Sequence, residues 1–379
     1  MKKIVAGLAA LAMAASVFAV DVASMIQIDG DLMNYDGSDF KMIMAKDYDP
    51  SGSSDYVWKL SASGDKAGAE IWSWVKDLTT TTTTTTTLND TDDPEDGIPD
   101  TATSSSTSTT SSILSQYSLW FKPFDWLKVT VGNIYASSAF NPQFGWWAKH
   151  TEYSKYGYQC DFTFDALTLR LALGEGKGNY WLDCSQSGFA MIGSFWFDVQ
   201  YNLGSIGTVQ AYVSKEVDNH PHGFNTFAYD CLVAGAAFGN NPYMQNGYYV
   251  ELSAAFGASE YWKTEVYDFD KLLASVYGQY FVNGFGFQMI NLAQLQKSGD
   301  AMKFRYGFEF KGTYALDSGW TPYVQINGYE IMDKKMEIDL GISGSVGSCT
   351  ITTWAALPLE FASGYKFNFS VPVQFTVNL

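Results

Sequence analysis

The sequence predicts an all-β protein, a transmembrane antiparallel up-and-down β-barrel of about 16–18 strands that follows an N-terminal signal peptide. Three observations predict this fold. Hydrophobic residues make up 46% of the 379 residues, yet the mean hydropathy is -0.09, so apolar and polar residues are interleaved. The chain holds 34 Gly, 24 Tyr, 26 Phe and 12 Trp, which suits strands joined by glycine turns. Short and long links between the expected strands alternate along most of the chain.

The charge balance limits the partners. Charged residues are 17% of the chain, below the roughly 25% of an average soluble domain. The formal net charge is -17, which repels polyanions and argues against nucleic acid as a partner. The many aromatic residues exclude a disordered chain.

The first residues predict an export signal. A basic start, Met1-Lys2-Lys3, precedes an apolar, alanine-rich run, and Val17-Phe18-Ala19 fits a cleavage site. We therefore expect a signal peptide over 1–19 and a barrel domain over 20–379. An uncleaved membrane anchor is the alternative, although the apolar run is short for a span of roughly 20 residues. No later run is long and apolar enough for a membrane helix, which leaves an exported soluble β-protein or a closed barrel.

The C-terminal segment is the clearest expected strand. From Phe367 to Leu379, seven apolar residues alternate with five polar residues and Pro372, as in a strand with one apolar and one polar face. Its length exceeds the roughly 5–6 residues of soluble strands and reaches the roughly 9–11 of tilted membrane strands. In a soluble sandwich the apolar face forms the core, whereas in a membrane barrel it contacts lipid. Further segments alternate in the same way: 127–132, 167–174, 195–202, 304–311 and 336–343.

The lengths of the links favour the barrel. Short links are expected at 63–66, 123–125, 165–166, 204–207, 283–284 and 317–319, and Asn283-Gly284 is a strong hairpin signal. Long links are expected at 77–112, 136–155, 175–188, 217–228 and 258–270. This alternation places the short turns and both termini at one end of a barrel, and the long loops at the other. The link at 239–246 interrupts this alternation, because a short link is expected at its place in the chain and the link is long.

The signal peptide, the aromatic hairpin over 119–132 and the alternating last strand carry a resemblance to a known family. The chain resembles Gram-negative outer-membrane porins, and in style it is closest to the outer-membrane proteins of spirochaetes. The resemblance implies an outer-membrane location, contact with outer-membrane lipid, insertion by the outer-membrane assembly machinery, and a homotrimer. Two features depart from it. Such proteins commonly end in Phe or Trp rather than Leu379, and Pro372 removes one donor from the last strand.

The alternation assigns a set of charged residues to the polar face, which lines the lumen of a barrel of this width. The expected pore-lining residues are Lys128, Arg170, Asp198, Glu251, Arg305, Glu309, Lys311, Glu337 and Asp339. Five acids and four bases leave the wall nearly balanced, and most other acids lie in links, so we expect a weak preference for cations. The alternative role for each charge is a cross-strand ion pair that supports the wall.

The resemblance to porins makes the link 136–155 a candidate constriction inside the lumen. We count this link as the third long loop, and the third long loop of porins often folds inwards. Its candidate residues are Phe140, Asn141, Phe144, Trp146 and Trp147. The alternative is an extracellular loop that packs on the rim.

Residues 77–112 are low in complexity and are expected to form an extracellular loop rich in Thr, Ser and Asp. Within it, the candidate calcium ligands are Asp92, Asp93, Asp96 and Asp100. Pro94 at a ligand position and the lack of a closing Glu break the usual spacing, so a solvated acidic loop is the alternative.

No enzyme and no cofactor are expected. The three histidines, His150, His220 and His222, all fall in expected links, and two neighbouring ligands make a weak metal site. The four cysteines permit three pairings after export, and Cys160 with Cys184 is the first candidate because one short hairpin and part of a loop separate them.

The sequence therefore predicts a porin-like outer-membrane channel through which small hydrophilic solutes diffuse passively. One alternative is a closed or substrate-specific barrel that acts as a transporter or surface adhesin through its long loops. Another is a soluble secreted β-sandwich whose exposed Trp residues bind glycans.

Overall fold

The computed structural model describes residues 21–41, 56–87, 101–138, 152–176, 182–185, 191–215, 232–240, 248–259, 268–361 and 367–378. The expected signal peptide, 1–19, lies outside these ranges. Among the described residues, no helix has the length and apolar character needed to cross a membrane. The strands are β1 (Asp21–Tyr35), β2 (Phe40–Lys41), β3 (Tyr56–Ser63), β4 (Ala67–Thr87), β5 (Thr101–Phe124), β6 (Leu127–Ser137), β7 (Glu152–Phe164), β8 (Leu167–Gly174), β9 (Ser194–Asn202), β10 (Thr208–Lys215), β11 (Leu232–Gly239), β12 (Tyr248–Ser259), β13 (Asp268–Val282), β14 (Phe285–Ser298), β15 (Ala301–Tyr314), β16 (Trp320–Asn327), β17 (Lys335–Val346), β18 (Cys349–Glu360) and β19 (Phe369–Asn378), with a 3-10 turn, η4 (Ile331–Asp333), before β17.

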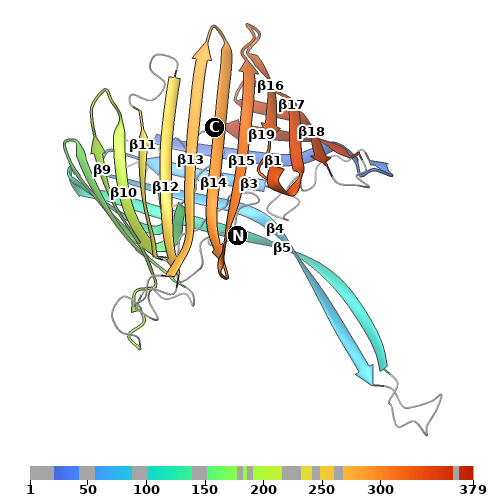
Figure 1. The fold of residues 1–379 in the computed structure, drawn as a ribbon, viewed down its shortest axis with the longest axis horizontal. Helices are drawn as coiled ribbons and strands as arrows, with labels where there is room; N and C mark the ends of the chain where they lie inside the picture. Colours follow the sequence, from blue (N-terminus) through green and yellow to red (C-terminus); the bar gives the residue numbers. More distant parts are fainter. Residues whose placement is uncertain are drawn as a thin grey trace.

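The strands form one antiparallel sheet that closes on itself (Figure 1). One edge of β1 pairs with β19, where Ile26 lies opposite Val377, and its other edge pairs with β3, where Ile26 lies opposite Trp58. Of the nineteen strands, β2 has two residues and only prolongs the pairing along β1, so eighteen strands form the ring. The structure confirms the up-and-down barrel and its predicted strand number. It overturns the sandwich alternative, which needs two separate sheets.

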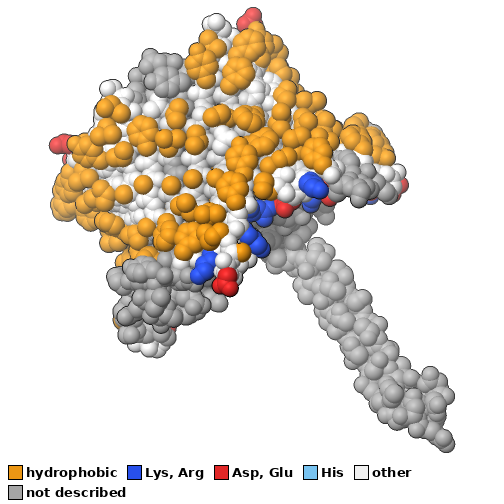
Figure 2. Space-filling view, in the orientation of Figure 1, with side chains coloured by type: hydrophobic (Ala, Val, Ile, Leu, Met, Phe, Trp, Pro, Cys, Tyr) orange, Lys and Arg blue, Asp and Glu red, His pale blue; other side chains and the backbone are white. Residues whose placement is uncertain are grey.

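The wall has an apolar outer face and a polar inner face along much of its circumference. On β17, Leu340 is 48% exposed on the outside, whereas its neighbour Asp339 is 7% exposed on the inside. Phe287 and Phe310 likewise project outwards from β14 and β15. Figure 2 shows hydrophobic side chains spread over the outer surface of the barrel, with charged side chains gathered near its ends. An apolar outside and a polar inside are what a bilayer imposes on a spanning barrel.

The short turns gather at one end of the barrel, which we call the short-turn end, together with the start of β1 and the end of β19. The links at this end are 64–66, 125–126, 165–166, 203–207, 240–247, 283–284, 315–319 and 347–348. Asn283 and Gly284 both have positive φ, 47° and 82°, as a two-residue hairpin turn requires. The alternation of short and long links has two exceptions: the long link 240–247 at this end and the short turn Gly299-Asp300 at the other end. The predicted alternation of short and long links is otherwise confirmed.

The structure corrects the loop expected at 77–112. Asp77 pairs with Ser111, and the pairing continues to Thr87 opposite Thr101, so both flanks of this segment are strands. Threonine favours extended backbone, and the ladder only prolongs β4 and β5 beyond the ring. This hairpin projects far from the barrel (Figure 1). Residues 88–100, which include the calcium candidates Asp92, Asp93, Asp96 and Asp100, lie outside the described residues.

Aromatic side chains cluster on the outer face at the short-turn end. Phe124 and Trp126 are stacked with ring centroids 5.1 Å apart, and Phe285 and Tyr314 are 4.5 Å apart. Such a belt is typical of the boundary between lipid and water. Beside it, Lys66 of the β3–β4 turn pairs with Asp125 of the β5–β6 turn and holds the pKa of that carboxyl below its usual range.

Two tryptophans, Trp72 and Trp120, lie on the inner face rather than in this belt. Trp72 packs under the Lys59 ammonium, 4.3 Å from the ring centroid, and donates a hydrogen bond to Glu70. Trp120 is 5.1 Å from the Lys128 ammonium. Both rings therefore belong to the polar inner wall.

Candidate functional site

The inner wall carries a row of charges across four neighbouring strands. The pairing places Lys128 of β6 opposite Asp161 of β7, Asp161 opposite Arg170 of β8, and Arg170 opposite Asp198 of β9. Arg170 bridges the two acids: its Nε lies 2.8 Å from Asp161 Oδ1, and its Nη1 lies 3.5 Å from Asp198 Oδ2. We call these four residues the charge ladder. Its two bases and two acids cancel.

The members of the charge ladder differ in their access to the lumen. The side chain of Asp198 is 0% exposed, whereas that of Arg170 is 21% exposed. Trp196 Nε1 donates a hydrogen bond to Asp198 Oδ2 at 2.6 Å, and the Trp196 ring stacks on Tyr212 with centroids 4.4 Å apart. Asp198 therefore acts as a buried partner that fixes Arg170, while Arg170 presents its charge inwards.

A second group of charges lies on β15 and β17. Four charged residues share one face of the sheet, because Gln325 and Asn327 of the intervening β16 lie opposite them: Glu309, Lys311, Glu337 and Asp339. This is the inner face, because Asp339 is buried beside the outward-facing Leu340. The Lys311 Nζ lies 4.3 Å above the ring of Tyr323. Three carboxyl groups and one amine leave this group with an acidic excess. We call these four residues the acidic group.

A tyrosine from the β16–β17 link covers part of the acidic group. The Tyr329 hydroxyl donates a hydrogen bond to Glu309 Oε2 at 3.1 Å, and Tyr329 is 2% exposed. Burial beside the Glu309 carboxyl raises the pKa of the Tyr329 hydroxyl, so it remains a donor. The link therefore bends over the inner wall at this point.

The remaining charged candidates have other positions. Arg305 pairs with Asp333 of η4, away from the short-turn end. Glu251 lies on β12 opposite Tyr277, and its side chain is outside the described residues. The constriction candidates Phe140, Asn141, Phe144, Trp146 and Trp147 also lie outside the described residues.

An apolar cluster on the inner wall was not expected from the sequence. It extends from β6 to β14 and includes Tyr329 of the β16–β17 link, and its side chains are buried. Its members are Ile134, Ala136, Tyr153, Ala172, Trp196, Tyr212, Val233, Ala255, Leu273, Tyr277, Ile290, Leu292 and Tyr329. Inner-face residues of an unobstructed wide channel contact water, so the lumen is narrowed along this side.

One hydrogen bond shows how the wall folds inwards beside this cluster. Gln210 Nε2 of β10 donates to the carbonyl oxygen of Ser137, at the end of β6, over 3.2 Å. Three strands lie between β6 and β10 in the sheet, a separation of roughly 19 Å along the wall. The end of β6 therefore leans over the inner face, and the adjoining Ser138 is 0% exposed.

The other expected chemistry is not assembled in the described part of the chain. Cys160, Cys184 and Cys349 are free thiols there, so the pairing of Cys160 with Cys184 is wrong. No three His, Cys, Asp or Glu side chains of the described residues converge to hold a metal ion. His150, His220 and His222 lie outside these residues.

Solved structures of outer-membrane proteins share this fold, although no family model and no curated protein matches the sequence. OccK1 (OpdK) of Pseudomonas aeruginosa has a TM-score of 0.53 at 9% identity, over 95% of this chain and 98% of that chain. OccK10 (OpdN) of the same organism has a TM-score of 0.53 at 8% identity, over 95% and 99%. OccAB2 of Acinetobacter baumannii has a TM-score of 0.51 at 9% identity, over 95% and 98%. The fold is that of an outer-membrane β-barrel protein.

Proposed function

We propose that the protein is a porin-like channel of the outer membrane of a Gram-negative bacterium and that small hydrophilic solutes diffuse through it. The observation that carries this proposal is the closed eighteen-stranded ring with an apolar outside and charged groups on its inner face. Such a ring has no free edge and encloses a polar path across a bilayer. Passage needs no covalent chemistry and no cofactor.

The distribution of charge favours a weak preference for cations. The charge ladder is neutral as a whole, and Arg305 is paired with Asp333. The acidic group keeps an excess of carboxyl groups on the inner wall. A lumen lined by such an excess raises the local concentration of cations.

Conductance in a planar bilayer tests this function. We expect discrete current steps that scale with salt concentration, and a reversal potential of the sign for cation preference in a salt gradient. A folded protein that inserts but never conducts would show that the barrel is closed. The long-loop alternative, a surface adhesin, would then be the better proposal.

A substrate-specific channel is the second candidate function. The apolar cluster on the inner wall and the inward lean of β6 narrow the lumen, which favours discrimination between solutes. We retain Phe140, Asn141, Phe144, Trp146 and Trp147 as constriction candidates, because β6 leads into them. OpdK, which shares the fold, has been solved with vanillate. Uptake that saturates with one solute class would support this candidate.

The proposed location has further consequences. We propose that residues 1–19 are removed on export and that the outer-membrane assembly machinery inserts the barrel. A homotrimer remains part of the proposal. The likeness in style to spirochaetal proteins stays a prediction, since the similar structures named above are from Pseudomonas and Acinetobacter.

A further inference from the structure

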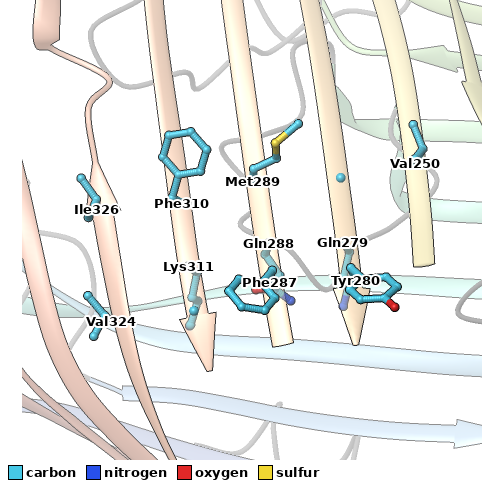
Figure 3. A pocket seen from close by; sticks show the side chains of 12 residues that line it. Val250, Gln279, Tyr280, Phe287, Gln288, Met289, Phe310, Lys311, Val324 and Ile326 are labelled. Carbon is cyan, nitrogen blue, oxygen red and sulfur yellow. The ribbon is translucent and has the colours of Figure 1, made fainter. Parts of the chain in front are cut away.

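The outer wall of the barrel has an apolar groove over β12 to β16. Its volume is about 540 Å³. Figure 3 shows its side chains projecting from neighbouring strands, with Tyr280, Phe287, Met289 and Phe310 among them.

Two glycines create the groove. Gly278 of β13 lies opposite Met289, and Gly312 of β15 lies opposite Phe287 and Val324. A Cβ atom added at Gly312 would meet nothing within 4 Å. The missing side chains therefore leave a depression between large outward-facing residues, of which Phe287 is 58% exposed and Val324 is 47% exposed.

The lining of the groove is suited to a ligand without polar atoms. Gln279, Gln288 and Lys311 also border it, but these three residues lie opposite one another on the inner face, where the Lys311 ammonium is 4.3 Å above the Tyr323 ring. The outward-facing side chains that line the groove are otherwise apolar, apart from the hydroxyl of Tyr280. Apolar surface in a concave site binds hydrocarbon with little need for directional contacts.

The groove lies in the half of the wall next to the short-turn end. Tyr280 and Phe287 are near the turn 283–284, and Gly312 and Val324 are near the turn 315–319. Short turns of outer-membrane barrels lie on the periplasmic side, and the stacked pair Phe285–Tyr314 marks the lipid–water boundary there. The lipid beside the groove therefore belongs to the periplasmic leaflet, which is built of phospholipid.

We propose that this groove binds one acyl chain of a phospholipid from the periplasmic leaflet. The proposal rests on the outer-membrane location proposed above. The flanking side chains hold the chain against the glycine floor, and the headgroup lies at the level of the aromatic belt. A second copy of the barrel is the competing occupant, because small residues also allow two walls to approach closely.

Native mass spectrometry tests the proposal on the whole mature protein, reconstituted in vesicles of dioleoyl phosphatidylethanolamine and released in detergent. We expect one retained phospholipid per barrel. Gly312→Leu fills the groove and should lower this retention about tenfold, a change equivalent to roughly 1.4 kcal/mol. Gly278→Ala is the milder second variant, since its new Cβ would lie 3.5 Å from Met289, an ordinary contact. Ala236→Leu, on the outer face of β11, is the matched control and should retain lipid like the wild type.

The outcomes separate the possibilities. Equal retention in the wild type and both groove variants overturns the proposal. Loss of dimers or trimers in Gly312→Leu with unchanged lipid retention also overturns it, in favour of a second copy. A heat-dependent shift in gel mobility shows that each variant is folded. A wild-type chain that never inserts into vesicles would instead refute the outer-membrane function itself.

Discussion

Gln210 and Ser137 are joined by a hydrogen bond across the inner face of the barrel, from the Gln210 amide nitrogen to the Ser137 carbonyl oxygen over 3.2 Å. Their strands, β10 and β6, are separated by β7, β8 and β9 in the sheet. The bond therefore holds the end of β6 over the lumen. It joins the wall to the segment in which the sequence predicts a constriction.

Gln210→Leu should loosen this arrangement. The substitution keeps the size of the side chain and removes the donor to the Ser137 carbonyl, at a cost of about 1 kcal/mol. We expect a larger mean conductance and noisier open-channel current in single-channel recordings. Gln288→Leu, on the inner face of β14, is the matched control. Identical traces for both variants would mean that the end of β6 does not limit the path.

Arg170→Gln should destabilise the barrel through its effect on Asp198. Asp198 is fully buried, and removing its partner leaves a carboxyl group without a compensating charge, at a cost of about 3 kcal/mol. Urea unfolding in detergent should show this loss. Asp198→Asn in the same chain should restore part of it, because the charge that needs Arg170 is then absent. If the double variant is no more stable than Arg170→Gln, the ion pair does not account for the loss.

The strands and their outward faces could be predicted because outward-facing positions are almost uniformly apolar. Phe304 and Phe310, for example, lie on the expected face with 56% and 43% exposure. The apolar cluster on the inner wall could not be predicted, because both faces of β13 and β14 are apolar. Its members on these two strands are Leu273, Tyr277, Ile290 and Leu292. Alternation then carries no information about which face is wet.

Only some of the contacts between side chains on neighbouring strands could be predicted from the sequence. Asp161 and Arg170 are symmetric about the turn Asp165-Ala166, so counting outwards from the turn predicts their pairing. The contact of Arg170 with Asp198 spans the link 175–193, whose length fixes no register. The inner position of Trp120 could not be predicted, because Leu119, Trp120 and Phe121 form an apolar triplet in which the alternation does not show which face each residue occupies.

Glu337→Gln should weaken the preference for cations. The acidic group supplies the excess carboxyl groups of the inner wall, and removing one negative charge should move the cation-to-anion permeability ratio towards one, by roughly twofold at low salt. Reversal potentials in a salt gradient measure this ratio. Asp300→Asn removes the same charge at the exposed turn between β14 and β15 and serves as the control. An equal effect of both variants would assign the selectivity to overall charge rather than to the wall.

The projecting hairpin of β4 and β5 should be dispensable for the channel. The pairing of β4 with β3 ends at Trp74, and that of β5 with β6 ends at Ser118, so the ring does not depend on the outer part of the hairpin. Val75 lies opposite Ile113, so an Asn-Gly turn in place of residues 76–112 closes the hairpin in register. We expect this variant to show the gel shift of a folded barrel and a conductance within about a fifth of the wild-type value, because the turn keeps the strand twist and every ring pairing. Replacing 128–161 in the same way removes pairings within the ring and should abolish the shift. A folded but non-conducting hairpin variant would show that the segment outside the ring contributes to the path.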